Sequence, residues 1–139
     1  MALIVDASVA IKWFIQEPDS DRARALLSGS ERLFAPDLIV IEVCNAAWRR
    51  ARLGDIVATQ AVAIAELIGR MPWTLEPSVE LAPRATTISL ALDHPVYDCF
   101  YLAAAERHEA AVVTADGRLI RRLAGAAWRQ RVIDLRSTD

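Results

Sequence analysis

LIVDASVAIKWF, residues 3–14, places a strand, an acid and a helix in direct succession. Residues 3–5 are apolar and predict a short buried strand, whereas the apolar residues after Ala7 recur with the period of a helix. Asp6 and Ser8 lie at the junction between these two patterns. Burying a carboxylate costs free energy unless the group has a partner. The stretch therefore predicts a strand that leads into a helix, and the acid between them needs an explanation.

The alternation of strand and helix continues to the end of the chain. Further strands are predicted at residues 33–35, 73–76, 110–116 and 131–135, and helices at about 20–27, 37–53, 56–69, 78–92, 97–108 and 117–123. Strands that alternate with helices form a parallel sheet covered on both faces. We therefore expect an α/β fold, a three-layer α/β/α sandwich around a central parallel sheet of about five strands. No repeat, linker or low-complexity segment divides the chain, so residues 1–139 are expected to form one domain.

The composition is typical of a cytoplasmic globular domain. Apolar residues make up 54% of the chain and charged residues 24%, which is enough for a core of its own. Cys44 and Cys99 fit neither a disulfide framework nor a CxxC metal pair, so we expect small core residues in a reducing cytoplasm. No basic segment precedes the first apolar run, and no apolar run approaches the ~18 residues that span a bilayer. We expect neither a signal peptide nor a membrane anchor.

Positive charge is local rather than global. The net charge is −2, which gives no overall attraction for nucleic acid. Lys12 is the only lysine, and some of the arginines gather in three local clusters: Arg49, Arg50 and Arg52; Arg118, Arg121 and Arg122; and Arg129 and Arg131. The planar guanidinium group suits phosphate. Contact with phosphate and solvated helix faces both stay open as interpretations.

Four acids lie where a parallel sheet gathers functional groups, beyond the carboxyl ends of its strands. Asp6 and Asp116 each follow a predicted strand, Asp98 begins a predicted helix, and Glu42 lies about one turn into an otherwise apolar helix. Each acid has a structural alternative. Asp6 and Asp98 could be helix caps, Asp116 could belong to an Asp-Gly turn, and Glu42 could pair with an arginine.

Convergence of the four acids would require either protons or a cation. A like-charge pair 4 Å apart costs about 4 kcal/mol at an effective dielectric constant near 20. An all-oxygen set selects a hard ion, Mg²⁺ or Mn²⁺, and such an ion can activate water for attack on a phosphodiester. Near the acids, Ser8 and Thr114 could hydrogen-bond the ligands, although Ser8 could equally cap a helix. His94 could touch the substrate.

Four stretches resemble, in order, the four signatures of the PIN-domain ribonucleases. They are IVDASVAIKWF (4–14), APDLIVIEVCNAAWR (35–49), HPVYDCFYLAAAE (94–106) and AVVTADGRL (111–119). Their spacing is most similar to the VapC toxins of bacterial toxin–antitoxin pairs. The resemblance implies that the catalytic and metal-binding residues are Asp6, Glu42, Asp98 and Asp116, with Mg²⁺ or Mn²⁺ as the cofactor. It matches Ser8, Thr114 and Asn45 to the polar residues around these acids, and Asp93 is a spare carboxylate that could serve a second metal.

The same resemblance implies a function and two partners. It implies a PIN-like fold and an endoribonuclease that cleaves RNA as a toxin and is silenced by a cognate antitoxin. A homodimer is also expected, because the helix predicted at 56–69 is apolar on nearly every side and because Trp13, Phe14 and Trp48 exceed the needs of a small core. The alternative is that these side chains fill the core. A housekeeping RNA-processing nuclease and a non-catalytic PIN-fold interaction module remain open.

Overall fold

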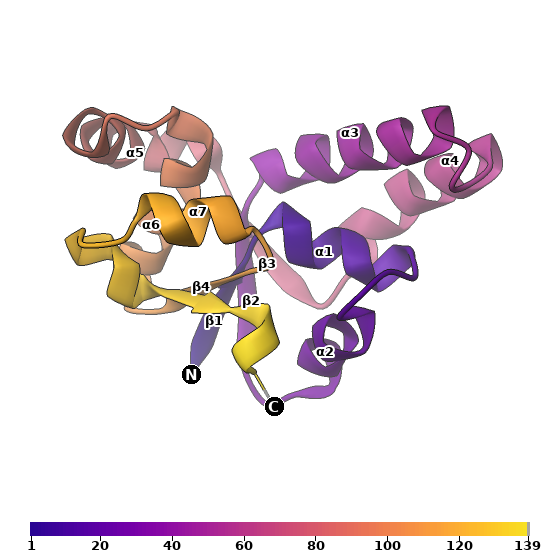
Figure 1. Ribbon diagram of the computed structural model, residues 1–139, viewed down its shortest axis with the longest axis horizontal. Coiled ribbons are helices and arrows are strands. Elements are labelled where there is room, and N and C mark those ends of the chain that lie inside the picture. Colours follow the sequence, from indigo (N-terminus) through magenta and orange to yellow (C-terminus); the bar gives the residue numbers. More distant parts are fainter. Residues whose placement is uncertain (139) are drawn as a thin grey trace.

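The computed structural model describes residues 1–138 as a five-stranded parallel sheet with helices on both faces (Figure 1). The strands are β1 (Ala2–Val5), β2 (Arg32–Pro36), β3 (Trp73–Glu76), β4 (Ala111–Thr114) and β5 (Val132–Asp134). Their order across the sheet is β3-β2-β1-β4-β5, and every neighbouring pair is parallel. The predicted α/β/α sandwich is confirmed.

The helices divide into two groups. They are α1 (Ala7–Phe14), α2 (Ser20–Ala25), α3 (Leu38–Arg52), α4 (Ala58–Leu67), α5 (Ser78–Leu92), α6 (Val96–Arg107) and α7 (Gly117–Arg122), with short 3₁₀ turns at Leu26–Ser28, Ile68–Arg70, Ala127–Arg131 and Leu135–Ser137. Helix α6 packs on β1, β2 and β4, with α5 against it, while α1 packs on β4 and contacts α2 and α3. Helices α3 and α4 run side by side and extend past the sheet (Figure 1). Within residues 1–138, no helix has the length and apolar character needed to cross a membrane.

The central position of β1 fixes where its acid lies. Ile4 and Val5 are fully buried and pair with Val112 and Val113 of β4, which are buried as well. Short apolar runs of this kind are typical of parallel strands covered on both faces. The Asp6 amide donates to the Val113 carbonyl at 3.3 Å, so the pairing extends one residue beyond β1. The Asp6 backbone is therefore held at the centre of the sheet's carboxyl edge.

The helix predicted at 56–69 forms as α4 and the following 3₁₀ turn, but most of it is not buried in the chain. Ile64 and Ile68 are buried, whereas Val62 is 59% and Leu67 44% exposed. The physical reason is that α4 packs mainly on α3 and lies beyond the sheet (Figure 1). Burial against the domain is thus wrong for most of this helix, and burial against a partner stays a prediction.

The aromatic residues and cysteines divide between core and surface. Trp13 is buried beside Trp73, with ring centroids 5.1 Å apart, and its indole nitrogen donates to the Ala23 carbonyl at 2.8 Å. Phe14 is half-buried against the core, so both residues of α1 serve packing. Trp48 is 54% exposed on α3. Cys99 is fully buried as predicted, whereas Cys44 is only half-buried.

Candidate functional site

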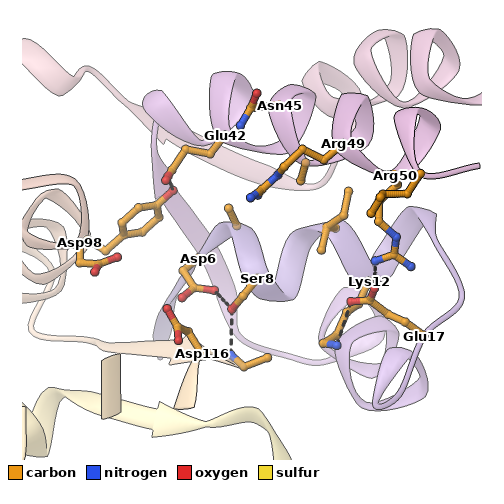
Figure 2. Close-up of a pocket in the computed structure, with 16 residues that line it drawn as sticks. Asp6, Ser8, Lys12, Glu17, Glu42, Asn45, Arg49, Arg50, Asp98 and Asp116 are labelled. Carbon is orange, nitrogen blue, oxygen red and sulfur yellow. Dashed lines mark hydrogen bonds and ion pairs between the residues drawn. The ribbon is translucent and has the colours of Figure 1, made fainter. Parts of the chain in front are cut away.

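A cleft of about 660 Å³ opens at the carboxyl edge of the sheet, between α1, α3 and α6 (Figure 2). Four carboxylates from four separate segments line it: Asp6, Glu42, Asp98 and Asp116. We call this part of the cleft the acidic end. Ser8 and Asn45 line the same cleft, while Thr114 lies beneath it. The topology therefore gathers the acids that sequence reasoning grouped together.

Asp6 is the most confined of the four carboxylates, with 7% of its surface exposed. Its Oδ1 accepts from the Ser8 hydroxyl at 2.6 Å and from the Val9 amide at 3.2 Å, and its Oδ2 accepts from the Thr114 hydroxyl. The pKa of Asp6 is raised from 3.8 to about 6, mainly by burial. The three hydrogen bonds lower the pKa, but by less than burial raises it. Asp6 is also the N-cap of α1. The structural interpretation of this acid is thus correct, and it coexists with a position in the cleft.

Ser8 links the two segments that meet beneath Asp6. Besides donating to the carboxylate, its hydroxyl oxygen accepts from the Ala115 amide at 2.9 Å. Thr114 is fully buried, and its hydroxyl oxygen accepts from the Asp116 amide at 3.0 Å. The predicted contacts of both hydroxyls with an acid are present. Together they hold Asp6 in one orientation relative to the loop after β4.

Glu42 pairs with a tyrosine rather than with an arginine. The Tyr101 hydroxyl of α6 donates to Glu42 Oε1 at 2.5 Å. Burial raises the pKa of the Glu42 carboxyl, Tyr101 lowers it, and the nearby charge of Asp98 raises it further. Burial and the neighbouring Glu42 carboxylate raise the pKa of Tyr101 well above its usual range, so Tyr101 remains a proton donor. The arginine pairing expected as an alternative is therefore wrong for Glu42.

Tyr101 is a site residue that sequence reasoning missed. It follows Asp98 by three residues on α6, a spacing that places both side chains on one face of the helix. That spacing was the available signal. The partner of Tyr101, 59 residues away along the chain, could not be read from it.

Asp98 lies in the first turn of α6 but does not cap it, because Pro95 holds the N-cap position. Its Oδ2 lies 2.7 Å from Nε2 of His94, in the short link before the helix. His94 is not among the residues that line the cleft, but it holds one that is. Asp93 is exposed at the left-handed C-cap of α5, with φ of 50°, and does not line the cleft. The structure thus separates Asp93 from the acids it was grouped with.

Asp116 is the N-cap of α7, and its Oδ1 accepts from the amides of Arg118 at 2.9 Å and Leu119 at 3.4 Å. The Asp-Gly turn considered as an alternative is wrong, because Gly117 is the first residue of α7 and Asp116 caps that helix, and Asp116 also lines the cleft. Asn45 lies one turn after Glu42 on α3, with its side chain exposed (Figure 2).

The other half of the cleft is basic and was not recognised as part of the site from the sequence. It is lined by Lys12 of α1, Glu17 after α1, and Arg49 and Arg50 of α3 (Figure 2). We call this part the basic end. Sequence reasoning singled out the Arg49–Arg52 cluster and the lone Lys12 by charge. It did not place them beside the acids, because that requires α1 and α3 to pack together.

The donor set of the acidic end suits a hard divalent cation, because carboxylate oxygens favour Mg²⁺ or Mn²⁺. Within residues 1–138, no three side chains of His, Cys, Asp or Glu are close enough together to hold a metal ion by themselves. Mg²⁺ commonly binds through one or two carboxylates, with waters and substrate phosphates completing its shell. The residues therefore fit such an ion without a complete protein cage, and convergence on one ion stays a prediction.

Comparison with known proteins gives a consistent result. The family model of the PIN domain matches residues 3–126. The chain is 31% identical over 121 residues to ribonuclease VapC3 of Pyrobaculum aerophilum, and the aligned region covers 86% of this chain and 92% of that protein. It is 32% identical over 117 residues to ribonuclease VapC9 of Mycobacterium tuberculosis, and the aligned region covers 84% of this chain and 87% of that protein.

Two solved structures share the fold. PAE2754 from Pyrobaculum aerophilum superposes with a TM-score of 0.69 at 23% identity, covering 99% of this chain and 91% of that one. A chain of a toxin–antitoxin complex from Klebsiella pneumoniae gives a TM-score of 0.68 at 16% identity, covering 97% and 98%. At these identities, the two structures support the architecture of the sheet and helices.

Proposed function

The chain belongs to the PIN-domain family, and from this premise we propose that it is an Mg²⁺- or Mn²⁺-dependent endoribonuclease that acts as the toxin of a toxin–antitoxin pair. One observation carries the enzymatic part of the proposal. Four carboxylates from different segments line a single cleft at the carboxyl edge of a parallel sheet. The toxin part is supported by similarity to proteins named VapC ribonucleases and by the fold shared with a chain of a toxin–antitoxin complex.

The chemistry of the proposed reaction divides between the cation and the side chains. When bound, the divalent ion would lower the pKa of a water and neutralise charge on the phosphoryl oxygens. Asp6, Glu42, Asp98 and Asp116 would supply carboxylate oxygens to it. Ser8 and Thr114 fix the two oxygens of Asp6. This assignment needs no protein nucleophile.

Tyr101 and His94 complete the arrangement of the acidic end. Tyr101 holds Glu42 through Oε1, and His94 holds Asp98 through Oδ2. Each contact uses one carboxylate oxygen, so Oε2 of Glu42 is not bound by Tyr101 and Oδ1 of Asp98 is not bound by His94. Orienting a ligand through a second hydrogen bond is the usual support of a metal site in proteins.

The exposed surface of α3 and α4 supports the proposed partners. Large apolar side chains are exposed on and between these helices: Ile41, Trp48, Leu53, Val57, Val62 and Leu67. Exposed apolar patches of this kind mark interfaces. We assign them to a homodimer that also accepts an antitoxin segment.

Inhibition is proposed to act at the acidic end. A basic side chain of the antitoxin would pair with the carboxylates in place of the cation, because a guanidinium group binds carboxylates bidentately. Raising the Mg²⁺ concentration should then weaken inhibition by competition. Superimposed inhibition curves at several Mg²⁺ concentrations would place the inhibitory contact elsewhere.

The test of the function is RNA cleavage by the purified chain with added Mg²⁺, with Mn²⁺ and with a chelator. We expect metal-dependent internal cleavage and a loss of about a thousandfold in Asp98→Asn, because one oxygen donor of the set is replaced by an amide. Asp93→Asn is the matched control, because this acid lies five residues away on the exposed side and outside the cleft. Equal activity of the two variants would contradict the assignment.

A further test separates the toxin from a housekeeping nuclease or a non-catalytic module. Induction of the chain should arrest growth, and co-expression of the gene beside it should restore growth. Cleavage without growth arrest would favour RNA processing. An absence of cleavage under every metal condition would favour the module.

A further inference from the structure

The two ends of the cleft differ in how their charges are compensated. At the basic end, Lys12 is buried, and its Nζ contacts Glu17 Oε1 at 2.9 Å and the Pro18 carbonyl at 2.8 Å. Arg50 pairs through Nη1 with the other oxygen of Glu17 and through Nε with Asp55 Oδ2 at 3.0 Å. Lys12 and Arg50 therefore have carboxylate partners within the chain.

Arg49 is the exception. It lines the cleft and is exposed, and within residues 1–138 its guanidinium group forms no ion pair and donates no side-chain hydrogen bond. Figure 2 shows it reaching from α3 across the cleft toward α1, between the acids and the Lys12–Glu17 pair. A guanidinium group with five donors and no acceptor is suited to a ligand that brings negative charge into the cleft.

The spacing along α3 sets where that ligand lies. Arg49 follows Glu42 by seven residues, which is almost two full turns and places both on the same face of the helix. Their backbones are about 10 Å apart along the axis at 1.5 Å per residue. An arginine at this spacing can hold a neighbouring phosphate of a strand whose reacting phosphate lies at the acidic end.

We infer that Arg49 binds a phosphate of the substrate RNA next to the one that is cleaved and aligns the strand along α3. This inference rests on the proposed ribonuclease function. Phosphate contacts position a nucleic acid without reading its sequence, so Arg49 contributes affinity and alignment rather than base preference. Arg50, with its charge already balanced by Glu17 and Asp55, keeps α3 joined to the segment after α1.

The test compares two arginines of the same helix. Arg49→Gln removes the contact, and Arg49→Lys keeps the charge without the planar fork. Arg52→Gln is the matched control, since it removes the same charge from α3 at a residue outside the cleft, where the guanidinium group lies 5.6 Å from the centre of the Trp48 ring. Each variant is measured for binding to a fluorescently labelled single-stranded RNA, for steady-state kcat and KM, and for thermal unfolding.

We expect Arg49→Gln to weaken RNA binding about tenfold, as befits one hydrogen-bonded charge. The slope of log affinity against log salt concentration should become shallower by about 0.7, the value for one phosphate contact on a single strand. KM should rise more than kcat falls, and Arg49→Lys should recover part of the affinity. Arg52→Gln should stay within about twofold of the parent chain, and all three should unfold at a similar temperature.

The outcomes that contradict the two proposals are distinct. If the parent chain cleaves RNA and the two glutamine variants bind it equally well, the assignment of Arg49 is wrong while the ribonuclease function stands. If the parent chain neither binds nor cleaves RNA, the proposed function itself is wrong.

Discussion

The acidic end of the cleft and the outer surface of α3 and α4 depart from ordinary folding rules in opposite ways. At the acidic end, the Asp6 carboxylate is buried, and each of its oxygens accepts at least one hydrogen bond, from Ser8 and Val9 at Oδ1 and from Thr114 at Oδ2. On the outer surface, Trp48 and Val62 leave apolar area exposed to water. Neither arrangement is the most stable use of these positions.

The free-energy costs of the buried carboxylate and of the exposed apolar side chains have different origins. Buried polar groups are tolerated when their hydrogen bonds are complete, but a charge still loses solvation. Exposed apolar groups lose no hydrogen bond and give up only burial that a partner can supply. The buried carboxylate therefore makes the free energy of unfolding depend on pH. The exposed apolar side chains instead favour association with a partner.

The largest effect is expected at Asp6. Because its pKa is raised in the folded chain, its contribution to stability is fully present below pH 3.8 and is lost as the pH rises through about 6. Because the pKa of Asp6 is raised from 3.8 to about 6, ionisation of this carboxyl lowers the free energy of unfolding at neutral pH by about 3 kcal/mol. Asp6→Asn cannot titrate, so it should unfold at higher urea concentration than the parent chain at pH 7 without metal.

The pH dependence provides the control for this prediction. The advantage of Asp6→Asn should disappear at pH 4, where the parent carboxyl is protonated, and cleavage should be lost at every pH. Mg²⁺ should stabilise the parent chain at pH 7 more than the variant. A constant difference in the free energy of unfolding between pH 4 and pH 7 would contradict the link between burial and charge.

A smaller effect is expected from the hydroxyl that holds Glu42. Tyr101→Phe removes the donor at 2.5 Å and leaves the ring in the core, so cleavage should fall about tenfold. The apparent affinity for Mn²⁺, followed by thermal unfolding, should fall as well. Tyr97→Phe is the matched control on α6, because Tyr97 is 65% exposed. Equal activity of the two variants would show that Glu42 needs no support from Tyr101.

The smallest effect on the free chain is expected on α4. Val62→Ser should change the free energy of unfolding of the monomer by less than about 0.5 kcal/mol, because the side chain is exposed. Ile64→Ala, two residues further on but buried, should cost about 2–4 kcal/mol. Sedimentation should then show a dimer in the parent chain and a monomer in Val62→Ser. A parent chain that is monomeric at micromolar concentration would contradict the interface on this surface.

Much of the fold could be predicted because its signals are local. The strand at residues 3–5, the acid after it and the helix after that are all written within one stretch of sequence. Asp6 and Asp116 each end a strand, and parallel strands share a carboxyl edge, so their presence in one cleft follows from topology. Asp93 was grouped with them by proximity in sequence, yet its left-handed backbone at the end of α5 leaves it exposed and outside the cleft.

The sequence by itself determined the alternation of strands and helices, and with it the sheet edge at which the acids meet. Only the tertiary structure decided which charges have partners. Glu17 reaches Arg50 across 33 residues, and Tyr101 reaches Glu42 across 59. The same packing leaves Arg49 without an ion pair within residues 1–138 and leaves most apolar side chains of α4 exposed. Such pairings depend on the angles at which α1, α3 and α6 pack, and no local pattern of residues encodes those angles.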